Sequence, residues 1–329
     1  MDRKRQRIIN LITTTIVIII CVIVLIISFA IKARVEQNIA GSTNDPPSTP
    51  NTEDPEQPTL PDVNEITEAK FIDLQPTIDK WLATINREGK VGLMIYDLNN
   101  SRVAASYHEN EVFNVASIYK LLLAYDGYRQ ITIGAEHEDD IIVQNSDKGQ
   151  LTLSQCLDLI IRESYNGCAD PMHVDYARSA RVNSLIRNFE MDNTTNLGLQ
   201  STAADITKLL RAYWRHSDLA QSLWSKLSDS MLNQPPTSTS NHPPYDWRQG
   251  LPAGFSDKVD VYNKVGWERN STNTHWNIYA DAAILDFTEF KHQYTIAILT
   301  SNLSNHKKIS QLGQMIEETI TMQTDGIVK

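Results

Sequence analysis

Residues 117–124 read Ser-Ile-Tyr-Lys-Leu-Leu-Leu-Ala, so a serine and a lysine stand three positions apart at the start of an apolar run. The run predicts a helix, and side chains at positions i and i+3 share one face of a helix. We therefore expect the Lys120 amine to reach the Ser117 hydroxyl. Serine is a weak nucleophile until a base takes its proton, and a desolvated lysine loses its own proton more easily. The pair is a candidate nucleophile and base.

The spacing alone is weak evidence, because Ser304-Asn305-His306-Lys307 has it too. Two further motifs follow Ser117. Ser164-Tyr165-Asn166 stands just past a predicted helix and offers a hydroxyl to relay a proton and an amide to orient a substrate. Lys264-Val265-Gly266 stands on a predicted strand, where the lysine adds positive charge and the glycine lets a backbone approach closely. Ser304 has no such motifs after it. The order of the motifs along the chain therefore favours Ser117 as the nucleophile.

The apolar patterning around these motifs predicts one domain over residues 70–329. It predicts helices at 71–85, 151–161, 202–214, 219–232 and 308–322, and strands at 91–98, 102–107, 259–267, 278–287 and 294–303. Thr152 is the expected N-cap of its helix, and the polar, proline-rich run 234–254 predicts a loop. Strands at both chain ends with an all-helical insert between them indicate an α+β fold with an antiparallel sheet.

In the order of motifs and elements, residues 70–329 resemble the active-site-serine β-lactamase and penicillin-binding-protein superfamily, and within it the class A β-lactamase-like domain. The resemblance implies an acyl-enzyme mechanism. Ser117 would attack the acyl carbonyl after activation by Lys120, and Ser164 would pass a proton to the leaving nitrogen with the help of Lys264.

The resemblance also implies contacts to the substrate, made by Asn166 and by the strand 265–269. Asn166 would hold the substrate amide, and Val265 and Gly266 would line the substrate beside Lys264. The backbone N–H groups of Ser117 and Trp267 would form an oxyanion hole, in which one donor is worth about 3–4 kcal/mol of barrier. Arg269 or His275 could hold a substrate carboxylate, or both could be solvated loop charges.

Three departures from the family pattern bear on the reaction. Tyr165 replaces the usual aspartate of the second motif, and Val265 replaces a threonine whose hydroxyl would bond the substrate carboxylate. In class A enzymes a glutamate on a loop after the second motif activates the deacylating water. Here the run 193–199 looks like a shortened version of that loop without its glutamate. Glu190 and Glu163 are the fallback candidates. We expect acylation to be intact and leave deacylation open.

Four functions are therefore compatible with the motifs. The first is a serine hydrolase that opens β-lactams. The alternative is a D-alanyl-D-alanine peptidase or other penicillin-binding protein that acts on peptidoglycan stem peptides. A β-lactam receptor and an inactive wall-associated module rank lower, the receptor because residues 1–7 leave no room for a signalling domain.

The N-terminal fifth of the chain, residues 1–69, differs from the domain. Residues 8–31 are uncharged and rich in Ile and Val, long enough as a helix to cross a hydrocarbon core of about 30 Å. Basic residues precede Ile8, so the tail 1–7 is expected in the cytoplasm and the catalytic domain outside, on a single-pass membrane anchor. A cleaved signal peptide is the alternative. Residues 32–69, rich in Pro, Asp and Glu, predict a disordered linker.

The net charge and the cysteine and histidine content limit which partners, metals and disulfides we expect. The net charge is −10, and residues 70–329 are themselves acidic, which argues against binding nucleic acid. No cluster of Cys or His has a trusted metal-ligand spacing, and we expect no metal and no cofactor. Export would permit a disulfide between Cys156 and Cys168, but two buried thiols fit the sequence equally well, so geometry must decide.

Overall fold

A computed structural model of the chain describes residues 70–85, 89–232, 234, 237–239, 242–269, 276–303 and 306–325. They belong to one compact unit, Pro61–Lys329. The predicted tail (1–7), membrane anchor (8–31) and linker (32–69) lie outside the described residues. Within the described part, no helix has the length and apolar character needed to cross a membrane.

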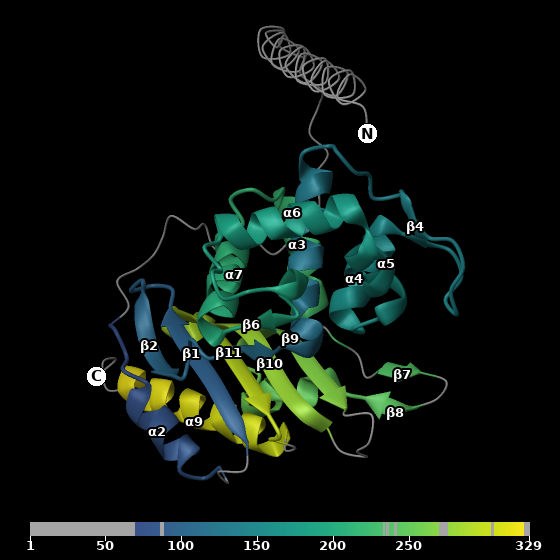
Figure 1. Cartoon of the computed structure of the whole chain (residues 1–329). Helices are drawn as coiled ribbons and strands as arrows, with labels where there is room; N and C mark the ends of the chain where they lie inside the picture. Colours follow the sequence, from purple (N-terminus) through teal and green to yellow (C-terminus); the bar gives the residue numbers. More distant parts are fainter. Residues whose placement is uncertain are drawn as a thin grey trace, which may run out of the picture. The chain divides into compact units, whose positions relative to one another are not determined.

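A five-stranded antiparallel sheet forms the centre of this unit, with strand order β2-β1-β11-β10-β9 (Figure 1). Among the described residues, the first strand pairs with the last, with Leu93 opposite Ile298. The sheet therefore joins both ends of the domain, and the predicted α+β class is confirmed. The strands are β1 Lys90–Asp97, β2 Arg102–Tyr107, β9 Asp260–Arg269, β10 Trp276–Phe287 and β11 His292–Ser301.

Two helices, α2 (Gln75–Leu82) and α9 (His306–Asp325), cover one face of the sheet. Trp81 of α2 is buried and donates a hydrogen bond from Nε1 to the Lys308 carbonyl (2.7 Å), which ties the two helices together. The predicted helix 71–85 is shorter in the structure. Proline is favoured in the first turn of a helix, and Pro76 stands there, so the helix begins only at Gln75.

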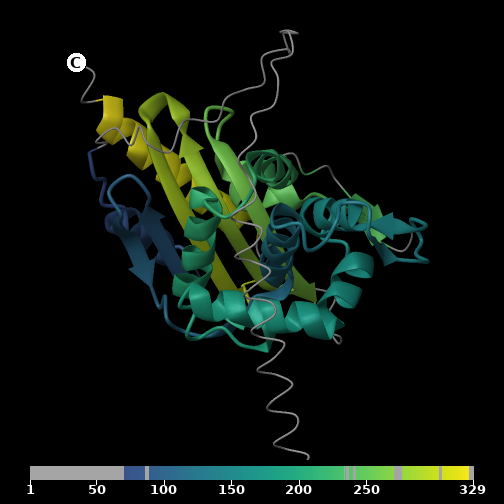
Figure 2. The same cartoon turned by 90° about the horizontal axis from the view of Figure 1, so that it is seen from above.

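The opposite face is covered by the helical insert (Figure 2), where α7 packs on β1, β10 and β11 and α8 packs on β9. The insert is mainly helical as predicted, but it is not all-helical: β4 (Ile141–Val143) pairs with β5 (Leu151–Thr152), and β3 (Phe113–Asn114) pairs with β6 (Gln200–Ser201). The patterning also missed α5, which contains Pro171, and α6. The helices of the insert are α3 Lys120–Thr132, α4 Leu153–Arg162, α5 Asn166–Val174, α6 Tyr176–Asn188, α7 Ala203–Arg215 and α8 Gln221–Leu232.

Local capping chemistry sets the start of α4. The Thr152 side chain accepts a hydrogen bond from the Gln155 backbone N–H (3.3 Å), and the Gln155 side chain accepts one from the Thr152 N–H (2.9 Å). This reciprocal capping box confirms Thr152 as the N-cap.

The prediction of a loop over 234–254 was wrong in part. Thr237–Thr239 and His242–Tyr245 pair as the short antiparallel strands β7 and β8, and two 3-10 turns follow, Trp247–Gln249 and Leu251–Gly254. Proline argues against a central strand but is tolerated in an edge strand, and the proline-rich pattern hid a two-stranded ribbon for that reason.

Candidate active site

Ser117 lies in a 3-10 turn, Ala116–Tyr119, directly before α3, and is half-buried. The turn packs against β9 so closely that a Cβ on Gly266 would lie 2.1 Å from the Val115 carbonyl oxygen. Only glycine permits this approach, which the sequence predicted for Gly266. The nucleophile candidate is therefore placed at the junction of the helical insert and the sheet.

Two buried lysines converge on the Ser164 hydroxyl. Lys120 Nζ donates to the Ser164 carbonyl (2.6 Å), to Ser164 Oγ (3.2 Å) and to Asn166 Oδ1 (2.6 Å). Lys264 Nζ donates to Ser164 Oγ (3.0 Å) and to the Val265 carbonyl (2.8 Å). The lysine side chains are 0% and 1% exposed. Four of the predicted residues, far apart in the sequence, thus form one hydrogen-bonded cluster beside Ser117.

The expected hydrogen bond between Lys120 and Ser117 is not among those of the described residues. Ser117 belongs to a 3-10 turn, and Lys120 is the first residue of α3 after that turn. The Lys120 amine is instead held by Ser164 and Asn166. The i, i+3 argument therefore predicted a partner for the Lys120 amine that differs from the partners it has in the structure.

Burial makes Lys120 suitable as a base. Desolvation lowers the pKa of Lys120 to about 7, and the negative charge of Asp170 opposes that shift. Desolvation also lowers the pKa of Lys264 well below its ordinary value, and the nearby charge of Lys120 lowers it further. A group whose pKa lies near neutrality can both accept and return a proton at physiological pH.

Asp170 is the carboxylate that sequence reasoning passed over. It lies on α5, four residues after Asn166 and three before His173, so the three share a helix face. Asn166 contacts Lys120 at one end of this face, and the His173 ring lies 5.1 Å from the Tyr119 ring at the other. The spacing from Asn166 was the signal that could have revealed it.

The two fallback bases lie elsewhere. Glu163 forms an ion pair with Lys148 (2.8 Å), and Glu190 lines a separate pocket with Lys208. Within the described residues, neither carboxylate contacts Ser117 or Lys120.

The predicted shortened loop does pack against the serine turn. The Leu199 carbonyl accepts a hydrogen bond from the Val115 N–H (3.1 Å), and Gly198 lies against Leu122 and Tyr119 of the serine turn and α3. From Asn193 to Thr202 the chain carries no acid. The loop beside the serine therefore supplies no carboxylate.

The remaining residues that were predicted to contact the substrate are Val265, Trp267, Arg269 and His275. Val265 is 1% exposed and alternates along β9 with Lys264, so its side chain lies on the other face of the sheet. The Trp267 indole packs edge-on against Tyr279 (5.0 Å between ring centroids), which leaves only its backbone for the predicted oxyanion role. The Arg269 side chain and His275 lie outside the described residues.

A buried polar group lies behind the site. Asp281 of β10 is fully buried and accepts hydrogen bonds from Asn263 Nδ2 and from the Leu251 N–H, each at 3.0 Å. Burial raises the pKa of Asp281 to about 6, and its charge in turn opposes the lowering of the Lys264 pKa. An acid inside an otherwise apolar strand was the signal for this group.

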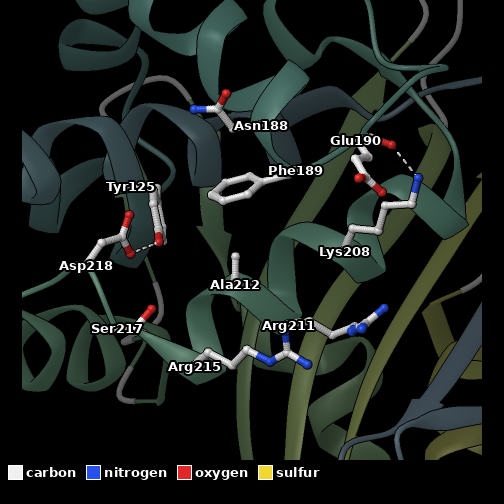
Figure 3. Close-up of a pocket in the computed structure, with 10 residues that line it drawn as sticks. All are labelled: Tyr125, Asn188, Phe189, Glu190, Lys208, Arg211, Ala212, Arg215, Ser217 and Asp218. Atoms are coloured by element: carbon white, nitrogen blue, oxygen red, sulfur yellow. Dashed lines mark hydrogen bonds between the residues drawn. The ribbon is translucent and has the colours of Figure 1, made fainter.

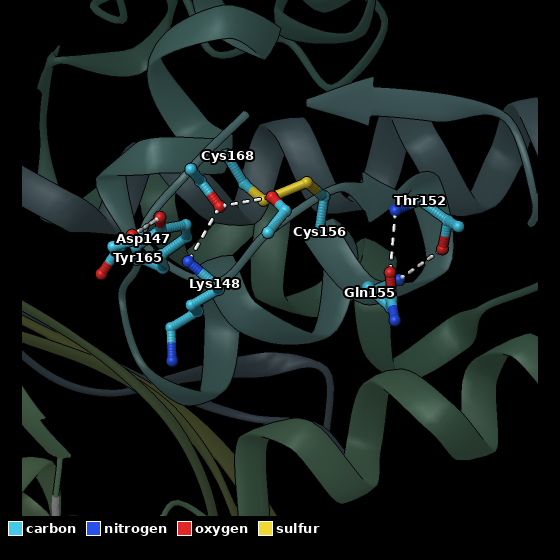
Figure 4. Close-up of a disulfide and its surroundings, with 9 residues drawn as sticks. Asp147, Lys148, Thr152, Gln155, Cys156, Tyr165 and Cys168 are labelled. Carbon is cyan, nitrogen blue, oxygen red and sulfur yellow. Dashed lines mark hydrogen bonds between the residues drawn. A yellow bond between two sulfur atoms is a disulfide. The ribbon is translucent and has the colours of Figure 1, made fainter. Parts of the chain in front are cut away.

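A disulfide joins Cys156 of α4 to Cys168 of α5 and encloses the turn that carries Ser164 and Asn166 (Figure 4). The sequence left open whether Cys156 and Cys168 are bridged or are two free thiols, and in the structure they are bridged. On the outside of the turn, the Tyr165 hydroxyl donates to the Asp147 carboxylate, and the Tyr165 ring lies over Gly167, where a Cβ would meet it at 2.4 Å. The turn is held on both sides.

Comparison with known proteins agrees with this fold. A sequence profile of the beta-lactamase enzyme family matches residues 73–320. No curated protein matches the chain. Among solved structures, PBP-A has a TM-score of 0.61 at 16% identity, with 76% of this chain and 97% of that chain covered. A class A beta-lactamase from Bacteroides cellulosilyticus has a TM-score of 0.60 at 15% identity, with 75% and 98% covered. A beta-lactamase from Chitinophaga pinensis has a TM-score of 0.60 at 17% identity, with 77% and 98% covered.

An antiparallel sheet with a helical insert and a serine-lysine cluster at their junction defines a serine β-lactamase or penicillin-binding-protein-like domain. The match over residues 73–320 shows that the chain belongs to the beta-lactamase enzyme family. The predicted superfamily is confirmed. Within the described residues, no group of three His, Cys, Asp or Glu side chains is arranged to hold a metal ion.

The lowered pKa of Lys120 predicts a pH dependence for acylation. Since only the neutral amine can accept a proton, the rate of covalent attachment of a fluorescent penicillin should rise with pH and level off above about 7. Asp170→Asn removes the charge that raises the Lys120 pKa, so the midpoint should move to lower pH. Asp139→Asn, an exposed acid outside the site, should leave it unchanged. A midpoint near 10 in the parent protein, the ordinary range of a lysine, would contradict the assignment.

Removing the disulfide should destabilise the fold and loosen the Ser164 turn. A bridge that closes a loop of this length contributes about 2–4 kcal/mol, so Cys156→Ser should lower the free energy of unfolding in urea by that amount. Acylation should slow as well, because the turn positions Ser164 and Asn166. The control is Cys21→Ser, since Cys21 is not part of the bridge. Equal stability of the two variants would show that the bridge does not form.

Proposed function

We propose that the chain is a serine hydrolase that opens the amide of β-lactams through an acyl-enzyme on Ser117. The observation that carries the proposal is the Ser164 hydroxyl, which accepts hydrogen bonds from two buried lysines next to Ser117. Such a hydroxyl can donate its own proton and be reprotonated at once. The family match and the serine-lysine geometry support the same chemistry.

The proton path follows from these contacts. Neutral Lys120 takes the proton of Ser117, and the Ser117 oxygen forms a bond to the β-lactam carbonyl carbon. As the carbon–nitrogen bond breaks, Ser164 gives its proton to the leaving nitrogen and is reprotonated by Lys120, which it contacts. Lys264 stabilises negative charge on Ser164 during the exchange. The backbone N–H groups of Ser117 and Trp267 are the proposed donors to the carbonyl oxygen.

A second candidate is a D-alanyl-D-alanine peptidase or another penicillin-binding protein acting on peptidoglycan stem peptides. The observation that favours it is the loop from Asn193 to Thr202, which packs against the serine turn without a carboxylate to activate water. One of the structural neighbours is a penicillin G acyl-enzyme of a PBP-A mutant. We propose that the Ser117 acyl-enzyme of this chain forms readily and is cleared slowly.

The experiment is to incubate the full-length chain with a chromogenic penicillin and follow both absorbance and protein mass. We expect one covalent adduct and slow turnover, both abolished in Ser117→Ala. Lys120→Met should slow acylation by about 10²–10⁴-fold, the usual contribution of a general base. Ser304→Ala removes the serine of the other Ser-x-x-Lys sequence and should change nothing.

The outcomes separate the candidates. Fast steady turnover indicates an efficient β-lactamase with a deacylating base. A stable penicillin adduct, together with release of D-alanine when the unacylated protein is given stem peptides, indicates the peptidase. Absence of any adduct, or an adduct that persists in Ser117→Ala, would falsify the nucleophile assignment.

We also propose that residues 8–31 anchor the chain in the membrane, with the domain outside the cytoplasm. The uncharged run and the basic residues before it support this. The full chain should stay with membranes after alkaline carbonate extraction, and a variant lacking residues 8–31 should be released. A mature protein whose sequence begins beyond residue 31 would indicate a cleaved signal peptide and contradict the anchor.

A further inference from the structure

A pocket of about 450 Å³ lies between α7, the C-terminal end of α6 and Tyr125 of α3 (Figure 3). Its volume is in the range of small-molecule sites. The lining shares no residue with the described Ser117 site, so its chemistry is a separate question.

One wall of the pocket is cationic. Lys208, Arg211 and Arg215 line it from α7 at positions i, i+3 and i+7, so one face of the helix presents three positive charges. Figure 3 shows Arg211 and Arg215 on the same side of the pocket, opposite Phe189. In a chain with a net charge of −10, this is a concentrated positive feature.

Neither Arg211 nor Arg215 forms an ion pair within the described residues. The Arg211 guanidinium is held over the Tyr96 ring, 4.0 Å from its centroid, and its buried Nε has no hydrogen-bond partner among the described residues. Arg215 is exposed and forms no ion pair within the described part of the chain. A guanidinium that forms no ion pair offers a planar set of N–H donors that matches a carboxylate or phosphate.

The acids of the pocket only partly offset this charge. Asp218 accepts a hydrogen bond from the Tyr125 hydroxyl and lies 3.4 Å from Arg129 Nε, so its charge is already paired. Lys208 is held by Asp205 (3.2 Å) and by the Glu190 carbonyl, while the Glu190 carboxylate is exposed at the rim. The pocket therefore retains positive charge from its two arginines.

An apolar surface faces the arginines. The Phe189 and Tyr125 rings meet edge to face, 5.3 Å between centroids, and Ala212 lies between the arginines on α7. A ligand whose anionic group bonded to the guanidinium groups would therefore place its other end against the Phe189 and Tyr125 rings. This pairing of free cations with an aromatic wall is the arrangement of a specific site for a small organic anion.

We propose that this pocket binds a small ligand in which an oxyanion, a carboxylate or a phosphate, is attached to an apolar or ring-shaped body. The oxyanion contacts Arg211 and Arg215, and the body lies against Phe189. The site is independent of Ser117 and does not rest on the proposed hydrolase activity.

The test is titration calorimetry of the full-length chain with three probes: phenyl phosphate, benzoate and inorganic phosphate. We expect phenyl phosphate or benzoate to bind more tightly than inorganic phosphate, because only they reach the aromatic wall. The stronger of the two identifies the oxyanion. Arg215→Ala should weaken the preferred probe about tenfold or more, as expected for loss of a charged hydrogen bond. Because Arg215 is exposed, this variant should fold normally.

Two controls separate the site from general charge effects. Arg187→Ala removes the same charge from an exposed position of α6 outside the pocket and should leave the affinity unchanged. Arg211→Lys keeps the charge but loses the planar fork, and should weaken binding as Arg215→Ala does. Absence of binding by all three probes, or equal weakening by Arg187→Ala, would overturn the proposal. Acylation by penicillin should persist in Arg215→Ala, so failure here is distinguishable from failure of the proposed function.

Discussion

Two buried lysine amines that share one half-buried hydroxyl are the constraint on which the site depends. Lys120 and Lys264 both donate to Ser164 Oγ while almost fully buried, and two desolvated like charges at this separation repel each other. Desolvation therefore lowers both lysine pKa values, and the negative charges of Asp170 and Asp281 oppose this for Lys120 and Lys264 respectively. The same burial that destabilises the charged form of Lys120 makes its amine available as a base near neutral pH.

The scaffold around the lysines serves to hold Ser164 between them. Ser164 adopts a left-handed backbone conformation (φ 56°), which is uncommon for a residue other than glycine. Such a conformation persists only where the surroundings impose it. Here the Cys156–Cys168 bridge closes the turn on the inner side, and the Tyr165–Asp147 hydrogen bond holds it on the outer side. The replacement of the usual aspartate by Tyr165 therefore has a structural consequence that the motif alone does not reveal.

Much of this arrangement could be predicted from the sequence, because the order of the three motifs and the apolar strands at both chain ends are local patterns. The residues that depend on packing could not. Asp170 becomes relevant only because α5 turns toward Lys120, and the sequence did not predict α5, which contains Pro171. The partners of the Lys120 amine depended on where the turn with Ser164 and Asn166 packs. The disulfide required the distance between Cys156 and Cys168, which spacing along the chain does not supply.

The pairing of β1 with β11 has a consequence for how the protein is made. Residues 90–97 form their ladder with residues 294–301, about 200 positions later, so the sheet cannot close during synthesis until the last strand has emerged. The helical insert, with Ser117, Lys120 and Ser164, is complete earlier, whereas Lys264 belongs to the late strands. A ribosome-bound nascent chain thus holds the nucleophile before it holds the second lysine, and its unpaired strand edges depend on chaperones or rapid completion for protection from aggregation.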